Sequence, residues 1–236
     1  MRLPFRRASS PRPAPPPYGS ARFARRFDRF RRFLDHRPVL DALERVAPLA
    51  GARVVELGAG TGVLTAPIAR RARVVVAADR SPAMLALARR NLDARRLANV
   101  RLLLADHRRL PLAGGSADLV LSAFAFDGLV HDAPDDSWSL ELDRAVREML
   151  RLRAPGGAVA FVGTPLGRPN IGRRLEQTWG FRRRVFLVRW RFPSRRLARA
   201  TVRLFFGRRV WLDYAPHWPR ALVTFCGVWW VRPSSP

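Results

Sequence analysis

A glycine-rich segment that follows Glu56 holds the residues of this sequence best suited to bind a nucleotide-like ligand. An apolar, β-rich run over Arg53–Leu57 leads into glycines at 58, 60 and 62, and a helical pattern follows. Glycines at a strand-to-helix turn remove the Cβ atoms that would collide with such a ligand. Dinucleotide-binding loops place Gly or Ala where this chain has Val63, and a Walker loop needs a lysine, which this sequence lacks. Pyrophosphate and triphosphate ligands are therefore disfavoured.

Two carboxylates follow the next two predicted strands. Asp79 stands 21 residues after Gly58, at the end of the second strand, where a carboxylate can accept hydrogen bonds from both hydroxyls of a ribose. Asp106 follows the third strand and is itself followed by His107. Because ligands bind at the carboxyl ends of parallel strands, we expect these acids and the glycine loop to share one crevice.

The ordered set of these segments resembles the class I S-adenosylmethionine (SAM)-dependent methyltransferases, and in particular their type-11 domain family. Residues 54–65 are similar to motif I of that family, and residues 79–85 to the motif around its ribose-binding acidic residue. Further similar segments lie at residues 105–106, 110–112, 116–120, 148–151, 155–157, 191–194, 205–207 and 226–230. The resemblance spans roughly residues 40–232, and motifs in this order are more specific than any one of them.

The resemblance implies SAM as the cofactor and assigns contacts to it. Glu56 and the glycines would shape the methionine side, and Asp79 would bind the ribose. Asp106 would face the adenine amino group, and Met84 would pack on the adenine. His107 departs from the family, where a small residue is more usual at that position. The predicted SAM-binding residues are Glu56, Leu57, Gly58, Ala59, Gly60, Thr61, Gly62, Asp79, Arg80, Met84, Asp106, His107 and Ser122.

Two residues after the fourth predicted strand are the candidates for catalysis. Methyl transfer from a sulfonium is an in-line displacement, so the protein mainly aligns the reacting atoms and excludes water, and a general base is optional. Asp127 and His131 follow that strand at the mouth of the crevice and are the candidate catalytic residues. A plainer role is open to each, because Asp127 can cap the next helix and a loop histidine is commonly solvated.

The pattern of apolar segments predicts the fold that positions these residues. Continuous apolar strands alternate with helices, which is typical of a parallel sheet covered on both faces. With the resemblance, the fold class expected is α/β: a Rossmann-like, doubly wound, seven-stranded and mostly parallel sheet whose last strand is antiparallel. Strands are predicted at residues 53–57, 74–78, 100–104, 117–122, 158–163, 185–192 and 221–231, and helices at 63–71, 82–91, 140–152 and 195–206.

The composition of the chain divides it into a tail and one domain. Residues 1–20 are rich in Arg and Pro, bury little apolar surface and are predicted to form a disordered tail. Residues 21–236 are predicted to form a single methyltransferase domain, in which residues 21–50 supply two amphipathic helices before the first strand. A length of 236 residues suits one α/β domain and is short for two.

The formal net charge of +26 is carried by arginine alone and is concentrated at both ends of the chain. Such a charge favours nucleic acid or an anionic membrane as a partner, although an arginine-rich, GC-biased proteome explains it as well. Arg195, Arg199 and Arg203 recur every four residues and form a basic helix stripe. That stripe is either a lipid or nucleic-acid contact or, as we favour, the solvated face of a covering helix.

Composition also argues against metal sites and membrane spans. The single Cys226, predicted to lie in the core, excludes an intramolecular disulfide and any multi-cysteine metal site. The four histidines lack metal-ligand spacing, so no metal is predicted. No apolar run approaches the roughly 18 residues that a span requires, and a cytoplasmic protein is predicted.

Three functions remain open from the sequence. The leading hypothesis is methyl transfer from SAM to a small-molecule or lipid-like acceptor. An RNA methyltransferase would use the basic ends for its substrate, and a non-catalytic SAM-binding or membrane-surface protein would keep the fold without turnover. The sequence carries no motif that identifies the acceptor, because selectivity in this fold lies in segments before the first strand and after the fifth.

Overall fold

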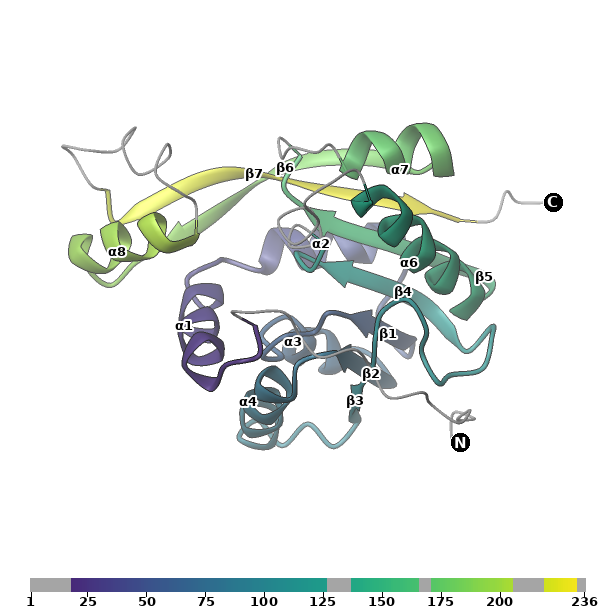
Figure 1. The fold of residues 1–236 in the computed structure, drawn as a ribbon, viewed down its shortest axis with the longest axis horizontal. Helices are drawn as coiled ribbons and strands as arrows, with labels where there is room; N and C mark the ends of the chain where they lie inside the picture. Colours follow the sequence, from purple (N-terminus) through teal and green to yellow (C-terminus); the bar gives the residue numbers. More distant parts are fainter. Residues whose placement is uncertain (1–17, 127–136, 166–170, 206–218, 233–236) are drawn as a thin grey trace.

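The computed structural model describes residues 18–126, 137–165, 171–205 and 219–232, and these ranges build a seven-stranded sheet (Figure 1). The strand order is β3-β2-β1-β4-β5-β7-β6. Neighbours from β3 to β5 run parallel, whereas β7 is antiparallel to both β5 and β6. The predicted Rossmann-like fold and its antiparallel last strand are confirmed. The strands are β1 (Arg53–Leu57), β2 (Val74–Asp79), β3 (Val100–Leu104), β4 (Ala117–Ala123), β5 (Arg153–Gly163), β6 (Arg182–Arg191) and β7 (Ala221–Val231).

Helices cover both faces of the sheet because its central strands are apolar on both sides. Val54 and Leu119 pack into one cluster, whereas their chain neighbours Val55 and Val120 pack into the other. Helices α1, α2, α3 and α8 contribute to the first cluster and α6 and α7 to the second, while α4 packs on β2 and β3. The helices are α1 (Ala21–Arg31), α2 (Arg37–Val46), α3 (Thr65–Ala69), α4 (Pro82–Asp93), α6 (Trp138–Leu152), α7 (Ile171–Trp179) and α8 (Arg195–Phe205).

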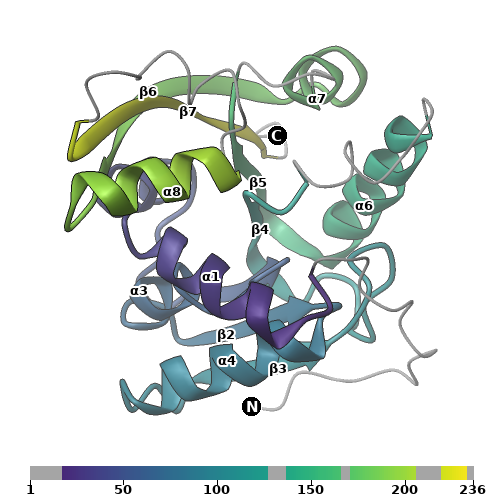
Figure 2. The ribbon, with the colours of Figure 1, turned by 60° about the vertical axis from the view of Figure 1, so that its left-hand side comes forward.

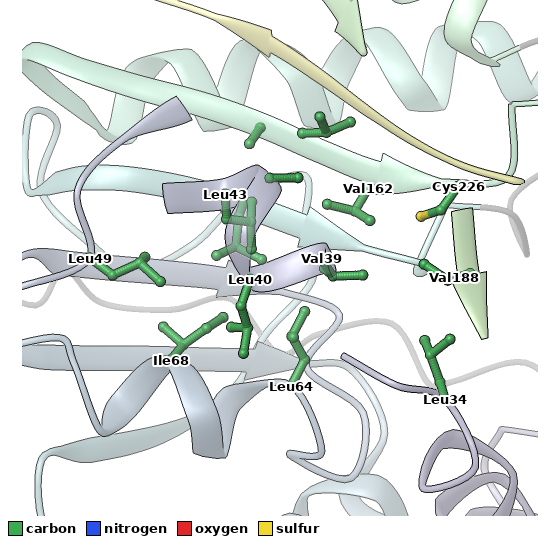
Figure 3. Packing of buried hydrophobic residues seen from close by; sticks show 14 of the residues in the cluster. Leu34, Val39, Leu40, Leu43, Leu49, Leu64, Ile68, Val162, Val188 and Cys226 are labelled. Atoms are coloured by element: carbon green, nitrogen blue, oxygen red, sulfur yellow. The ribbon is translucent and has the colours of Figure 1, made fainter. Parts of the chain in front are cut away.

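The first cluster joins the two ends of the domain (Figure 3). Leu43 of α2 and Ile68 of α3 are fully buried there. Val162 of β5 and Val188 of β6 lie in the same cluster, together with Cys226 of β7, which is buried as predicted. The basic C-terminal third therefore shares its core with the N-terminal helices.

Strands β6 and β7 form a hairpin that extends past the end of β5, the strand beside it. Ten pairs of residues join the two strands, from Arg182 with Trp230 to Arg191 with Ala221. Only residues 227–231 of β7 also pair with β5, so the rest of the hairpin extends past the sheet toward α8 (Figure 1). The chain before α2 joins this extension, since the backbone N–H of Asp35 donates to the Arg189 carbonyl at 2.8 Å.

Several boundaries differ from those predicted, and α7 was missed. Its apolar residues are few, at 171, 175 and 179, so the pattern of its sequence is weak. Helix α3 is shorter than predicted because the chain up to Leu64 is still part of the glycine turn. Strand β5 begins at Arg153, before the turn that was expected to precede it, with a register shift against β4.

Candidate functional site

The glycine loop after β1 has a backbone that only glycine adopts without strain. Gly58, Gly60 and Gly62 have φ values of +70°, +56° and +75°. A Cβ atom on Gly58 would lie 2.2 Å from the Cβ of Ala125, so no side chain fits there. The backbone N–H groups of Gly58 and Ala59 both donate to the Ala78 carbonyl of β2, at 2.8 and 3.0 Å. The loop is thus held against the ends of β2 and β4.

The carboxylate of Asp79 links this loop to the turn after β2. One of its oxygens accepts from the N–H of Gly60 at 2.8 Å and the other from the N–H of Ser81 at 2.9 Å. Burial raises the pKa of Asp79 above its ordinary value, while these two hydrogen bonds act to lower it. Each carboxylate oxygen keeps a further lone pair, so two hydroxyls of a bound ligand can still donate to Asp79.

Glu56, at the base of the loop, is a buried carboxyl. Its Oε2 accepts from the hydroxyl of Thr65 at 2.6 Å. Desolvation raises the pKa of Glu56 to about 7, and the hydrogen bond from Thr65 partly opposes this effect. The negative charge of Asp79 raises the same pKa further, whereas the positive charge of Arg31 lowers it.

Helix α1 covers the glycine loop from the other side. Asp28 holds it in place, because Asn91 of α4 donates to Asp28 and to the Thr61 carbonyl of the loop, both at 2.8 Å. Arg32 also bridges Asp28 and Asn91, at 2.7 Å to each. In Figure 2, α1 lies between α8 and α4, and the Phe205 ring of α8 packs on the phenylalanines of α1.

A cavity lies between α1, the glycine loop and the ends of β2 and β4. Arg31 reaches it from the last turn of α1, is only 8% exposed and places its guanidinium 4.0 Å from the centre of the Phe124 ring. The residues that line the cavity are Tyr18, Phe27, Arg31, Glu56, Gly58, Ala59, Gly60, Thr61, Val63, Leu64, Ala78, Asp79, Arg80, Ser81, Met84, Ala105, His107, Ala123, Phe124 and Ala125.

His107 stands where this cavity meets an aromatic row. Burial lowers the pKa of His107 to about 4, so the ring is neutral at physiological pH. Its Nε2 is buried and has no hydrogen-bond partner within the described ranges. The ring meets that of Phe126 edge to face at 4.9 Å, and Phe161 and Phe181 continue the row.

A second, apolar cavity lies beyond Phe126. Trp229 forms part of its wall, and glycines on both sides leave room for the indole: a Cβ on Gly172 would lie 2.4 Å from that ring and one on Gly227 2.5 Å. The indole N–H donates to Glu176 at 2.8 Å. The cavity is lined by Phe126, Phe161, Val162, Gly163, Thr164, Ile171, Gly172, Leu175 and Trp229. Aromatic and aliphatic side chains therefore form most of its lining.

Residues 54–157 match the family model described as a methyltransferase domain. The chain contains a class I SAM-dependent methyltransferase domain. The matched residues of this methyltransferase domain include the glycine loop, Asp79 and His107, whereas α1 and the β6–β7 hairpin lie outside them. The match does not distinguish the type-11 subdivision, which stays a prediction.

Curated relatives of the domain are methyltransferases of small molecules and of a carrier-protein-bound acyl group. The demethylmenaquinone methyltransferase of Thermus thermophilus is 36% identical over 126 residues, which cover 52% of each chain. The malonyl-[acyl-carrier protein] O-methyltransferase of Halorhodospira halophila is 40% identical over 123 residues, 50% of this chain and 38% of that one. The chain thus spans about half the length, or less, of these relatives.

Solved structures share the fold of the methyltransferase domain over most of the chain. The YcgJ protein of Bacillus subtilis has a TM-score of 0.57 at 15% identity, and the match covers 85% of this chain and 100% of that one. A SAM-dependent methyltransferase of Aquifex aeolicus has a TM-score of 0.54 at 21% identity, covering 70% of this chain and 91% of that one. At such identities the likeness shows the fold.

Most of the SAM-binding residues predicted from the sequence line the first cavity, and four do not. Leu57 and Ser122 are buried side by side in β1 and β4. Gly62 faces α4, where a Cβ would lie 3.4 Å from that of Ala88. Those that line it are Glu56, Gly58, Ala59, Gly60, Thr61, Asp79, Arg80, Met84 and His107.

Asp106 is the fourth of these residues. The sequence predicts that it faces the adenine, yet its carboxylate pairs with Arg108, whose Nε lies 2.7 Å away. Arg108 also pairs with Glu141 of α6. This pairing holds the pKa of Asp106 at about 2, well below its ordinary value, although burial acts to raise it. An arginine two residues later in the sequence thus engages the carboxylate that motif spacing assigns to the ligand.

The predicted catalytic residues Asp127 and His131 lie outside the described residues. The first cavity is also lined by residues that the sequence did not indicate, among them Tyr18, Phe27 and Arg31 before β1 and Phe124 after β4. Tyr18 falls within the segment predicted as a disordered tail, but its carbonyl accepts from the Ser81 hydroxyl at 2.7 Å. The phenylalanine periodicity of α1 showed an amphipathic helix, and no sequence signal showed what its apolar face covers.

Proposed function

We propose that this protein is an enzyme that transfers the methyl group of SAM to an apolar small-molecule or lipid-like acceptor. The observation that carries the proposal is the junction of two cavities at His107 and Phe126. The first cavity has a polar, glycine-lined wall with two carboxyls, and the second is lined mainly by apolar side chains. Methyl transfer needs two such adjoining sites, one for the donor and one for the acceptor.

The residues of the first cavity fit SAM. The space that a Cβ on Gly58 would fill is a cradle for close approach of a ligand, and Asp79 retains acceptor capacity for ribose hydroxyls. The buried Nε2 of His107 and Oγ1 of Thr61, both without partners among the described residues, offer polar contacts. Arg31 carries a positive charge suited to the carboxylate of the methionine part. When bound, SAM supplies an electrophilic methyl group on a sulfonium.

The chain itself orients the reactants and keeps water out. The side chains of Phe124 and Ala125 line the first cavity at the end of β4, and Phe27 lines it on the side of α1. Neutral His107 places no competing charge near the sulfonium, and its ring remains able to accept or donate one hydrogen bond. We propose that Phe126 and Phe161 hold the acceptor ring in line with the methyl group.

The relatives support an acceptor of this kind without identifying it. One is named for demethylmenaquinone and another for a malonyl group on acyl-carrier protein. The apolar second cavity favours a ring or chain of low polarity for this protein. Nucleic-acid binding and a cytoplasmic location stay predictions from the sequence. No helix within the described ranges is long and apolar enough to cross a membrane, and no group of three His, Cys, Asp or Glu is placed there to hold a metal.

The test is transfer of a labelled methyl group. The full chain is incubated with SAM carrying a tritiated methyl group and, separately, with the lipid, small-molecule and RNA fractions of a bacterial extract. The proposal predicts label in the lipid or small-molecule fraction, and less label with Phe161→Ala. Label confined to RNA, or no label in any fraction, would contradict it.

A further inference from the structure

The β6–β7 hairpin presents an exposed apolar face. The register sets Leu187 opposite Phe225. Val185 lies two residues before Leu187, and Val223 lies two residues before Phe225. Because side chains alternate between the two faces of a strand, all four lie on one side of the hairpin. Their exposed fractions are 55%, 55%, 42% and 47%. The other side of the same strands is buried in the core, as the 4% exposure of Trp190 shows. We name Val185, Leu187, Val223 and Phe225 the outer apolar stripe.

This stripe is a concentration of exposed apolar side chains and not part of a general scatter. Six large hydrophobic side chains are exposed among the described residues, and four of them form the stripe. The other two, Leu104 and Leu140, stand apart on β3 and α6. Helix α7 meets the hairpin nearer the sheet, at Trp229 and Arg183 (Figure 1). A clustered exposed apolar patch of this kind is typical of a surface that binds a membrane or another protein.

The charged residues of the hairpin and of α8 are all positive. Residues 182–205 and 219–232 contain eleven arginines and no acidic residue. Arg189 pairs with Val223 and lies on the face of the stripe, as does exposed Arg191 two residues further along. Glu176 of α7 pairs with Arg183 at the inner end, 3.4 Å away. Long arginine stems can lie along an apolar surface while their guanidinium groups reach outward to anions.

We propose that this face of the hairpin docks on an anionic lipid surface. Apolar side chains inserted among the headgroups and arginines paired with lipid phosphates are the two contributions to interfacial binding, and the hairpin provides both on one face. Three of the four side chains of the stripe are aliphatic, which suits lipid better than the base stacking of nucleic acid. A two-fold contact with a second copy would bring arginine-rich faces together and is disfavoured by like-charge repulsion. The proposal concerns a surface remote from the cavities and does not depend on methyl transfer.

The test is flotation of the full chain with vesicles of phosphatidylcholine alone or mixed with phosphatidylglycerol. Binding to the mixed vesicles is expected, with a partition coefficient that falls at least about fivefold in the double variant Leu187→Ser, Phe225→Ser. The double variant Leu104→Ser, Leu140→Ser removes equally exposed apolar side chains elsewhere and should bind like the wild type. Arg189→Gln should lower binding to the mixed vesicles by about fivefold.

Several results would overturn the proposal. One is equal flotation of the wild type and the Leu187→Ser, Phe225→Ser variant, and another is loss of binding in the control variant as well. Retention on single-stranded RNA that depends on the stripe, without flotation, would assign the face to nucleic acid. A dimer in sedimentation that dissociates only in the stripe variant would assign it to a second copy. Thermal unfolding of each variant checks that the fold is kept.

Discussion

Asp79 accepts a hydrogen bond from the backbone N–H of Gly60 at 2.8 Å, and this contact ties the end of β2 to the loop after β1. The same carboxylate therefore shapes the glycine loop and offers its remaining lone pairs to a ligand. Gly60 in turn lies under Phe27 of α1, since a Cβ on it would be 3.4 Å from that ring. Loop, carboxylate and covering helix form one unit around the first cavity.

Gly58→Ala is expected to abolish SAM binding and to destabilise the domain. Its new Cβ would collide with that of Ala125 and would also sit on a residue at positive φ. Gly156→Ala is the matched control, because Gly156 has a φ of +75° but nothing within 4 Å of the added atom. The control should lose only about 1–2 kcal/mol of unfolding free energy, from backbone strain. Urea unfolding and calorimetry measure both effects; equal behaviour of the two variants would contradict the steric argument.

The sheet and the glycine loop were predictable because each depends on residues close together in the sequence. Uninterrupted apolar runs such as residues 74–78 specify buried strands, and the glycines, with Asp79, follow at fixed spacing. The cover of the first cavity was not predictable in this way. Phe27 meets Gly60 through packing of α1 on α4, which depends on a contact between Asp28 and Asn91, 63 residues apart. Local pattern carries no information on such distant pairings.

Arg31→Met should weaken SAM binding by about tenfold, because it removes the buried positive charge from the cavity wall while keeping an apolar stem beside Phe124. Arg29→Met, on the exposed side of the same helix, should leave the affinity unchanged. Calorimetric titration with SAM and with 5′-methylthioadenosine, which lacks the amino-acid carboxylate, separates a contact with that carboxylate from an effect on the fold. A tenfold loss for both ligands would mean that Arg31 acts through the fold and not through the carboxylate.

The buried carboxyl of Glu56 predicts a pH dependence of stability. Its pKa is raised from 4.5 to about 7, so between these pH values the folded state holds a proton that the unfolded chain has lost. Its contribution to stability is therefore present below the lower value and is lost as the pH rises through the upper one.

Glu56→Gln removes this titration and keeps an oxygen that can accept from Thr65. The unfolding free energy of the variant minus that of the wild type should therefore rise by about 1–3 kcal/mol between pH 5 and pH 8. Urea unfolding at a series of pH values measures the difference. A constant difference across this range would show that Glu56 titrates alike in both states.

Gly172→Ala should impair the second cavity and spare the first. The added methyl group would meet the Trp229 indole at 2.4 Å and displace it toward the space we assign to the acceptor. We expect a slower initial rate of label transfer at saturating SAM, with unchanged SAM affinity. Gln177→Ala, exposed on the same helix, is the control and should keep the wild-type rate. Loss of SAM affinity in the Gly172 variant would contradict the separation of the two cavities.

The ion pair of Asp106 and the position of α7 were not part of the prediction. Motif spacing assigns Asp106 to the ligand, yet Arg108 engages it and links it to Glu141 on α6. Helix α7 has few apolar residues, and its position is fixed by the fit of Gly172 against Trp229 on a strand 57 residues later. The link from Arg108 to Glu141 and the placement of α7 depend on tertiary partners that a local pattern does not contain.

Calorimetric titration of the full chain with SAM is the most direct test of the central claim that the first cavity binds the methyl donor. Saturable binding at one site is expected. It should weaken by about tenfold to a hundredfold in Asp79→Asn, because this change removes the carboxylate that bonds Gly60 and that we propose binds the ribose. Asp93→Asn, at the exposed end of α4, should bind like the wild type. Absence of binding by the wild-type chain, or equal affinity of wild type and Asp79→Asn, would contradict it.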